Sequence, residues 1–261
     1  MWFSADNVVL VAAQSACVAL PAAGLPSWTD RLRSRWWALV APLSIVLVVA
    51  GIELVPSTAD VLTWVALLLV PVGCALALGW AMHGAWPPLA ALAAPLLALA
   101  WAAPDSRAGQ LAATALIAGS AVTLGRLLAG AAPLSLLKAG VYAMAAVDAW
   151  LVFTNRLQPA NAVLTSAVPA HGLPQLQSAS FGGAGLGYGD LFVAALAGGI
   201  LAAQRGPQLA AAVAVLAASL LWDQLFLVYD VLPATIPPAV VLLGCELLVR
   251  RRLLIPAPRT P

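Results

Sequence analysis

Charged residues are scarce in this sequence, and their scarcity excludes an ordinary soluble protein. Lys, Arg, Asp and Glu together make up 8% of the 261 residues, whereas a soluble domain usually carries about 25%. So few charges cannot cover a globular surface, and 63% of the residues are hydrophobic. We therefore expect lipid to be the main solvent of the chain. The net charge of +2, without a basic stripe of interleaved aromatic residues, argues against a nucleic-acid partner.

Cysteine and histidine are also rare, and their spacing predicts neither a metal site nor disulfide bonds. The cysteines lie in separate apolar segments without a CxxC spacing, so we interpret them as small core residues. The glycine run before residue 190 lacks the Gly-Lys-Ser/Thr that completes a phosphate-binding loop. The sequence thus predicts no metal and no cofactor. The residues concerned are Cys17, Cys74, Cys245, His83 and His171.

Long apolar runs, in contrast, fill most of the chain. A spanning helix needs roughly 20 mostly apolar residues, and nine such segments can be marked. They lie near residues 7–25, 36–54, 60–82, 85–103, 109–129, 134–154, 187–204, 208–229 and 234–252. The fourth contains Pro87, Pro88 and Pro95, and proline kinks a spanning helix. The sequence therefore predicts an all-α polytopic membrane protein with about nine transmembrane helices.

The basic residues predict an orientation in the membrane. Met1–Asn7 contains no Lys or Arg, so we expect the first segment to be a retained helix with the N-terminus outside. Lys and Arg are enriched in loops on the inner side. With that start, only Arg107 and Arg156 fall outside. The inner side receives Arg31, Arg33, Arg35, Arg126, Lys138, Arg205, Arg250, Arg251, Arg252 and Arg259. This split predicts an N-out, C-in chain with an odd number of spans.

The longest stretch without a predicted helix runs from about Asn155 to Gly185, which is long for a connection. It contains several prolines and the run Gly182-Gly183-Ala184-Gly185. The chain shows no internal repeat, which weakens an interpretation as a secondary transporter.

Two aspartates lie where an ionisable group is expensive. Asp148 is well inside the sixth apolar segment, and Asp190 is close to the start of the seventh. An aspartate at bilayer depth costs roughly 2.5–3.5 kcal/mol on insertion scales, so two on consecutive helices suggest a shared site. A single buried aspartate is as often a structural hydrogen-bonding group, but the pair favours a function. We interpret Asp223 and Asp230, at the end of the eighth segment, as interfacial.

Two neighbouring carboxyls can hydrolyse a peptide bond when one is ionised and the other is protonated. The ionised one draws a proton from water, while the protonated one polarises the scissile carbonyl. Carboxyls about 3 Å apart cannot both ionise, so they hold one proton between them. Which aspartate is the acid stays open, and the roles can interchange. The sequence therefore predicts that Asp148 and Asp190 form a catalytic pair.

Two short motifs accompany the aspartates. Gly187-Tyr188-Gly189 precedes Asp190, and its glycines permit close helix approach and an irregular backbone. Pro233-Ala234-Thr235 opens the last segment, close to two further prolines. Prolines there are compatible with an ordinary helix start. The functional alternative is an irregular edge that faces the aspartates and offers free N–H and C=O groups to an extended substrate. On that alternative, Pro233, Ala234 and Thr235 bind substrate.

These motifs resemble those of the GxGD intramembrane aspartyl proteases, the presenilin and signal peptide peptidase group, and especially their compact prokaryotic homologues. The resemblance rests on Gly187-Tyr188-Gly189-Asp190, the segment around Asp148, and Pro233-Ala234-Thr235. The family has nine spans, with its aspartates on the sixth and seventh and a Pro-Ala-Leu motif that opens the ninth. It usually has Tyr where Val147 stands, and Leu where Thr235 stands. Pro238-Ala239-Val240 is an alternative register for the last motif.

The resemblance implies a presenilin-like fold, with scaffold helices 1–5 in residues 1–133 and catalytic helices 6–9 in residues 134–261. It implies an intramembrane aspartic endopeptidase that cleaves transmembrane peptide substrates in the plasma membrane of a prokaryote. The N-out, C-in orientation is similar to that of the signal peptide peptidases, which implies substrates of type II orientation.

Two alternatives stay open. A prepilin-type peptidase also uses a GxGD motif, but it usually has Lys two residues after the Asp, where Phe192 stands, and its aspartates lie on early helices. A membrane transporter or a helix-binding chaperone would need no catalysis, because intramembrane acids also serve in proton relays.

Overall fold

The computed structural model describes residues 5–25, 31, 33–55, 57–167, 172–229 and 231–254, and most of them are helical. The α-helices are α1 (Ala5–Ala19), α2 (Val40–Leu54), α3 (Thr58–Leu76), α4 (Ala93–Ala102), α5 (Arg107–Ala131), α6 (Leu134–Phe153), α7 (Leu157–Ser166), α8 (Tyr188–Ala203), α9 (Gln208–Trp222) and α10 (Ile236–Leu254). Three 3-10 helices, η2 (Arg35–Leu39), η4 (Pro87–Leu92) and η6 (Asp223–Leu227), and the π-helical turn η3 (Ala77–Ala81) adjoin them. Two strands, β1 (Ser178–Phe181) and β2 (Ala184–Gly187), complete the fold.

The molecule is a mostly helical protein with segments suited to a membrane. Among the residues that are described, four helices are long and apolar enough to cross a bilayer: Thr58–Ala81, Arg107–Ala131, Leu134–Phe153 and Gln208–Leu227. Five shorter apolar helices accompany them: Asp6–Ala19, Pro42–Ile52, Pro87–Ala102, Tyr188–Ala203 and Ile236–Val249. This agrees with the expectation of a helical membrane protein. The count of nine spans and the presenilin-like arrangement stay predictions.

The connection between α6 and α8 is more ordered than the sequence predicts. The expectation of a stretch without helix from Asn155 to Gly185 is wrong, because this stretch contains α7 and most of an antiparallel hairpin. Pro159 falls in the first turn of α7, where proline is tolerated. Gly182, with φ of +58°, begins the turn between the strands, and a positive φ is readily adopted by glycine. The hairpin pairs Ser178 with Gly187 and Phe181 with Ala184.

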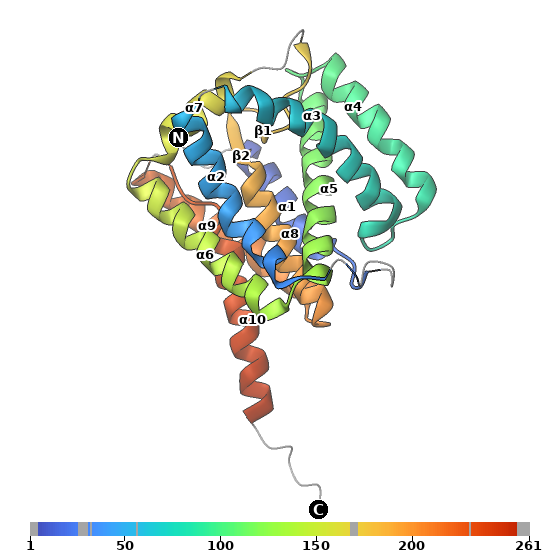
Figure 1. The fold of residues 1–261 in the computed structure, drawn as a ribbon, viewed down its shortest axis with the longest axis vertical. Helices are drawn as coiled ribbons and strands as arrows, with labels where there is room; N and C mark the ends of the chain where they lie inside the picture. Colours follow the sequence, from blue (N-terminus) through green and yellow to red (C-terminus); the bar gives the residue numbers. More distant parts are fainter. Residues whose placement is uncertain are drawn as a thin grey trace, which may run out of the picture.

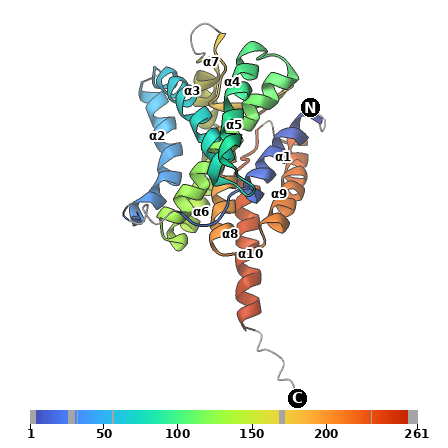
Figure 2. The same cartoon turned by 90° about the vertical axis from the view of Figure 1, so that its right-hand side faces the viewer.

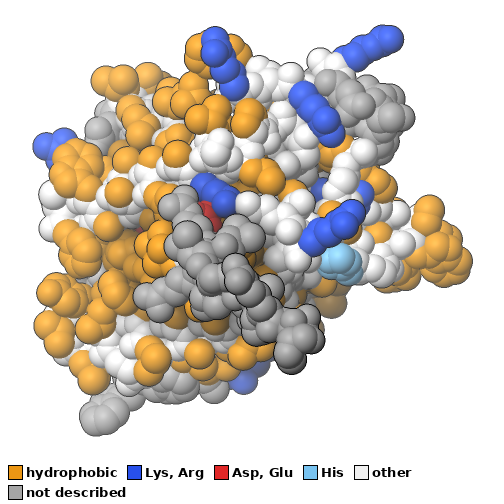
Figure 3. Space-filling model, turned by 90° about the horizontal axis from the view of Figure 1, so that it is seen from below, with side chains coloured by type: hydrophobic (Ala, Val, Ile, Leu, Met, Phe, Trp, Pro, Cys, Tyr) orange, Lys and Arg blue, Asp and Glu red, His pale blue; other side chains and the backbone are white. Residues whose placement is uncertain are grey.

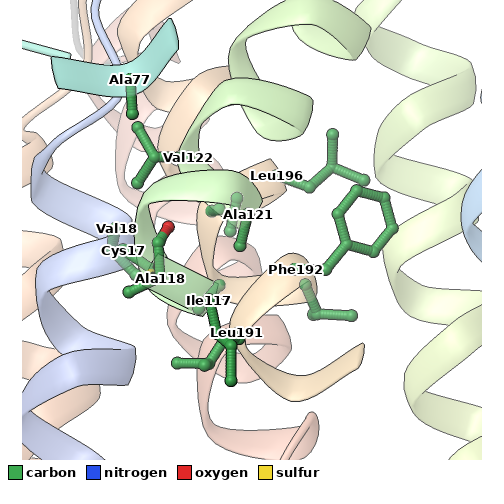
Figure 4. Packing of buried hydrophobic residues seen from close by; sticks show 14 of the residues in the cluster. Cys17, Val18, Ala77, Ile117, Ala118, Ala121, Val122, Leu191, Phe192 and Leu196 are labelled. Carbon is green, nitrogen blue, oxygen red and sulfur yellow. Dashed lines mark hydrogen bonds between the residues drawn. The ribbon is translucent and has the colours of Figure 1, made fainter. Parts of the chain in front are cut away.

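Helix α8 lies in the centre of the bundle, because small residues let its neighbours approach it closely. Every residue of α8 from Leu191 to Ala202 is buried. A methyl group on Gly125 of α5 would lie 2.4 Å from the Ala195 carbonyl oxygen of α8, so the two backbones are in contact. Figure 4 shows Ile117 and Ala121 of α5 packed beside Leu191 and Leu196 of α8. Such small-residue contacts are typical of membrane helices.

The two ends of the bundle differ in charge. At the end where α1 begins, Arg107 pairs with Asp6 across 3.5 Å, and Asp223 accepts a hydrogen bond of 2.5 Å from Asn7. At the opposite end, the Arg126 guanidinium donates to the Gly24 carbonyl. Helix α10 extends beyond the other helices at this second end (Figures 1 and 2), and several Lys and Arg side chains lie on the face seen from there (Figure 3). Asp230 and His171 lie outside the described residues.

The close approach of α1 to α8 can be tested with two glycines. A methyl group on Gly198 would lie 2.3 Å from the Val18 carbonyl oxygen, whereas one on Gly244 would meet no atom within 4 Å. We expect Gly198→Ala to lower the free energy of unfolding by about 1–3 kcal/mol, the usual cost of overpacking. Gly244→Ala should leave it nearly unchanged. Unfolding in mixed detergent micelles measures both, and equal stability of the two variants would contradict the packing.

The predicted orientation can be tested by labelling single cysteines. Arg33 and Asp105 are both exposed, near the basic end and the opposite end respectively. The experiment uses a chain with Cys245→Ala, because the two remaining cysteines, Cys17 and Cys74, are buried. Because basic loops stay inside, a membrane-impermeant maleimide added to intact cells should label Asp105→Cys and not Arg33→Cys. The reverse pattern would overturn the N-out orientation.

Candidate active site

Asp148 lies in the interior of the protein, on the buried face of α6. Only 5% of the residue is exposed. Its Oδ2 accepts a hydrogen bond of 2.6 Å from the Thr235 hydroxyl. A buried carboxyl without a partner is strongly destabilising, so Thr235 supplies a partner that α6 itself does not provide.

Asp190 occupies the third position of α8 and is half-buried. Its Oδ2 accepts a hydrogen bond of 3.0 Å from the Gly187 N–H, the residue that precedes the helix. This is the carboxylate half of a capping box, which satisfies a donor that the helix start leaves free. A side chain at Gly187 would crowd that carboxyl, because its Cβ would lie 3.2 Å from Asp190 Oδ2. The glycine thus leaves room for the aspartate.

Helices α6 and α8 pack side by side at the level of the two aspartates. A methyl group on Gly189 would lie 3.3 Å from the Met144 Cε, and Met144 is one turn before Asp148. The Gln14 amide nitrogen lies 3.5 Å from the Asp190 carbonyl oxygen and 2.8 Å from that of Ala234, and the next residue, Thr235, binds Asp148. The structure therefore brings the two predicted catalytic residues into one region between α6, α8 and the start of α10.

Helix lengths place both aspartates at the same depth. Helix α6 starts at Leu134, and α8 ends next to Gln204; these two residues line one cavity at the basic end. Asp148 is 14 residues from the start of α6, and Asp190 is 13 residues from the end of α8. At about 1.5 Å per residue, the two lie roughly 21 Å and 20 Å from that end. This distance is shorter than the thickness of a hydrocarbon core, which is about 30 Å.

The segment Pro233-Ala234-Thr235 lies against this region and is not helical. Pro233 and Thr235 are buried, Ala234 is half-buried, and α10 begins only at Ile236. Thr235 joins this motif directly to Asp148. The alternative register, Pro238-Ala239-Val240, falls in the first turns of α10, and Val240 is exposed. The contacts with Asp148 thus belong to the first register.

The expectation of free backbone groups is wrong at Ala234. Its carbonyl would bond to the N–H of residue 238 in a regular helix, but Pro238 has no N–H. Instead, the side chain of Gln14 in α1 donates a hydrogen bond of 2.8 Å to the Ala234 oxygen. The prolines of this segment therefore remove a local donor, and α1 replaces it.

Tyr188 fixes the start of α8 on a third helix. Its hydroxyl lies 2.9 Å from the hydroxyl of Ser120 in α5. The first three residues of α8 are thus held separately: Tyr188 by α5, Gly189 against α6, and Asp190 by the end of β2. This arrangement fixes the direction in which the Asp190 carboxyl leaves the helix.

Sequence reasoning did not identify Gln14 or Ser120 as neighbours of the site. Gln14 is 1% exposed and is an isolated amide in the apolar run of the first segment, which was the available signal. Ser120 is one of many small residues in α5 and carried no signal. Among the described residues, no three His, Cys, Asp or Glu side chains gather closely enough to hold a metal ion.

Comparison with known proteins does not identify the family of this chain. No protein-family model matches the chain, and neither does any curated protein or solved structure. The likeness to the GxGD proteases therefore rests on the motif residues alone.

The bond between Thr235 and Asp148 can be tested through stability. Thr235→Val keeps the shape of the side chain but leaves the buried carboxyl without this donor, so we expect the free energy of unfolding to fall by about 1–3 kcal/mol. Thr235→Ser keeps a hydroxyl and should lose less. In an Asp148→Leu background, Thr235→Val should cost little, because its partner is gone. Unfolding in mixed micelles measures the cycle, and additive effects would refute the bond.

Proposed function

We propose that this chain is an intramembrane aspartyl protease that hydrolyses transmembrane peptides with Asp148 and Asp190. The observation that carries the proposal is the meeting of three motifs from distant parts of the chain. Thr235 before α10 binds Asp148 in α6, and Gln14 contacts both the Asp190 backbone at the start of α8 and Ala234 beside Thr235. Carboxyls from two helices at one depth are what shared-proton hydrolysis requires.

In this mechanism the two carboxyls hold one proton between them. The ionised carboxylate removes a proton from water, and the resulting hydroxide attacks the scissile carbonyl carbon. The protonated carboxyl donates a hydrogen bond and then its proton to the carbonyl oxygen. Collapse of the tetrahedral intermediate breaks the C–N bond. The leaving nitrogen receives the proton that came from water, and one hydroxyl of the intermediate returns a proton to the other carboxylate, which restores the shared proton. Thr235 orients Asp148 by holding Oδ2, which is the role of a positioning residue.

The hairpin provides a route and an edge for substrate. Its turn lies at the outer end, where the Gly182 N–H donates to Gln110 of α5, and β2 runs from there to Asp190. Residues of β2 are alternately half-buried and exposed. A peptide that adds to a strand edge becomes extended, as proteolysis requires. Because Gly187 ends β2 three residues before Asp190, an added peptide would be directed at the carboxyls.

The length of α8 supports a site below the membrane surface. With 16 residues it spans about 24 Å, less than the roughly 30 Å of the hydrocarbon core. The hairpin takes up the remaining depth, and non-helical backbone is tolerated there only when protein or water surrounds it. We propose nine spans in all, with the shorter apolar helices crossing beside the four long ones. The plasma membrane of a prokaryote and type II substrates follow from the resemblance.

The decisive experiment removes each carboxylate without changing its shape. We expect Asp148→Asn and Asp190→Asn each to reduce cleavage of a type II transmembrane reporter by roughly 10³-fold or more, because the residues act as a unit. Asp223→Asn, an acid at the outer end, is the matched control and should cleave normally. Purified variants in liposomes are compared, with unfolding measured in parallel. Retained cleavage in either aspartate variant would overturn the proposal.

The same assay separates the alternatives. Reporters of type I orientation should be cleaved poorly, and a transition-state mimic of aspartyl proteases should block the wild-type protein. Binding of reporter helices without cleavage by the wild-type protein would favour a chaperone or transporter instead.

A further inference from the structure

Gln14 is a buried amide near the centre of helix α1, and its side chain bonds to other parts of the fold. Its Nε2 lies 2.8 Å from the Ala234 carbonyl oxygen and 3.5 Å from the Asp190 carbonyl oxygen. Its Oε1 accepts a hydrogen bond of 3.3 Å from the Ser219 hydroxyl in α9. A primary amide has two N–H donors, and here they face the backbones of the two segments that form the proposed site.

The need for this amide follows from the prolines of the last segment. Pro237 and Pro238 have no N–H, so the carbonyls of Pro233 and Ala234 lose the helical partners four residues ahead. Pro233 is left with a long bond of 3.5 Å from the Ile236 N–H. Ala234 receives its hydrogen bond from Gln14. A buried carbonyl without a donor costs free energy in an apolar interior, so the α1 side chain is what holds this backbone in place.

A continuous set of contacts then joins the Asp190 backbone to the Asp148 carboxyl. The Asp190 backbone faces Gln14, Gln14 binds Ala234, and the next residue, Thr235, binds Asp148. We propose that Gln14 is a positioning residue that fixes the Pro233-Ala234-Thr235 segment relative to Asp190 and thereby sets the spacing of the two carboxyls. This inference rests on the proposed protease function. It assigns to α1 a part in the proposed active site.

The chain offers a matched control in Gln208. This second glutamine also connects α1, α8 and α9, because its Nε2 contacts the carbonyl oxygens of Val18, Pro21 and Gly198 at 3.3, 2.9 and 3.2 Å. Gln208 is the first residue of α9, at the basic end of the bundle. It contacts α8 at Gly198, eight residues after Asp190, which is about 12 Å along the helix. Its loss removes similar bonds between the same helices without touching the site.

The experiment compares Gln14→Met with Gln208→Met, since methionine keeps the length of glutamine and removes its hydrogen bonds. For Gln14→Met, we expect kcat/KM on the transmembrane reporter to fall by about tenfold to a hundredfold, the usual effect of misplaced catalytic groups. Amide hydrogen exchange in residues 231–239 should become at least about tenfold faster, because local opening becomes easier. Gln208→Met should lose similar stability but stay within about twofold of wild type in both measurements.

The outcomes separate this inference from the proposed function. If the wild-type protein cleaves and the two methionine variants behave alike in cleavage or in exchange, the inference is overturned while the protease proposal stands. If the wild-type protein cleaves no reporter, the protease proposal fails. Exchange in residues 231–239 then still decides whether Gln14 holds this segment, and unchanged exchange overturns that as well.

Discussion

The structure depends on one constraint: every polar group at bilayer depth must find its partner within the protein. The Asp148 carboxyl finds the Thr235 hydroxyl, the Ala234 carbonyl finds the Gln14 amide, and the Asp190 carboxyl finds the Gly187 N–H. The first two partners lie far away in the sequence. Satisfying these groups therefore requires α1, α6, α8 and the start of α10 to meet at one place, which is the candidate active site.

Close packing around α8 makes that meeting possible. Glycines in α5 and α8 bring their backbones into contact, and Gly198 does the same between α8 and α1. A central helix enclosed in this way need not match the bilayer in length. At its start, the hairpin continues the chain towards the end of the bundle where α1 begins, since Gly182 lies next to Asp6. Helix α8 is thus both buried and short, and its first turn, with Asp190, lies next to the irregular backbone of the hairpin.

The apolar helices could be predicted because long hydrophobic runs are a local signal. Acids inside such runs are equally local, and they made Asp148 and Asp190 candidates for the site. The sequence did not predict the hairpin, since the pairing of Ser178 with Gly187 depends on a turn within a glycine-rich stretch that has no alternating pattern. Nor did it identify Gln14, whose partner is a backbone carbonyl. The sequence does indicate that the Ala234 carbonyl needs a partner, because Pro238 has no N–H to donate to it. Proline is the one residue type that lacks a backbone N–H, so only a proline reveals in the sequence that a helical donor is missing.

Thr235 shows why a departure from a family motif can be structural and not neutral. A leucine at this position would fill space beside Asp148 but could not donate to its carboxyl. With threonine, the segment before α10 is held on both sides, by Gln14 on α1 through the Ala234 carbonyl and by Asp148 on α6 through the Thr235 hydroxyl. Hydrogen bonds depend on direction as well as distance. Two of them, to two different helices, therefore restrict the position of an irregular backbone more than apolar packing on one side does. The prolines free this segment from the helix, and the two bonds determine where it lies.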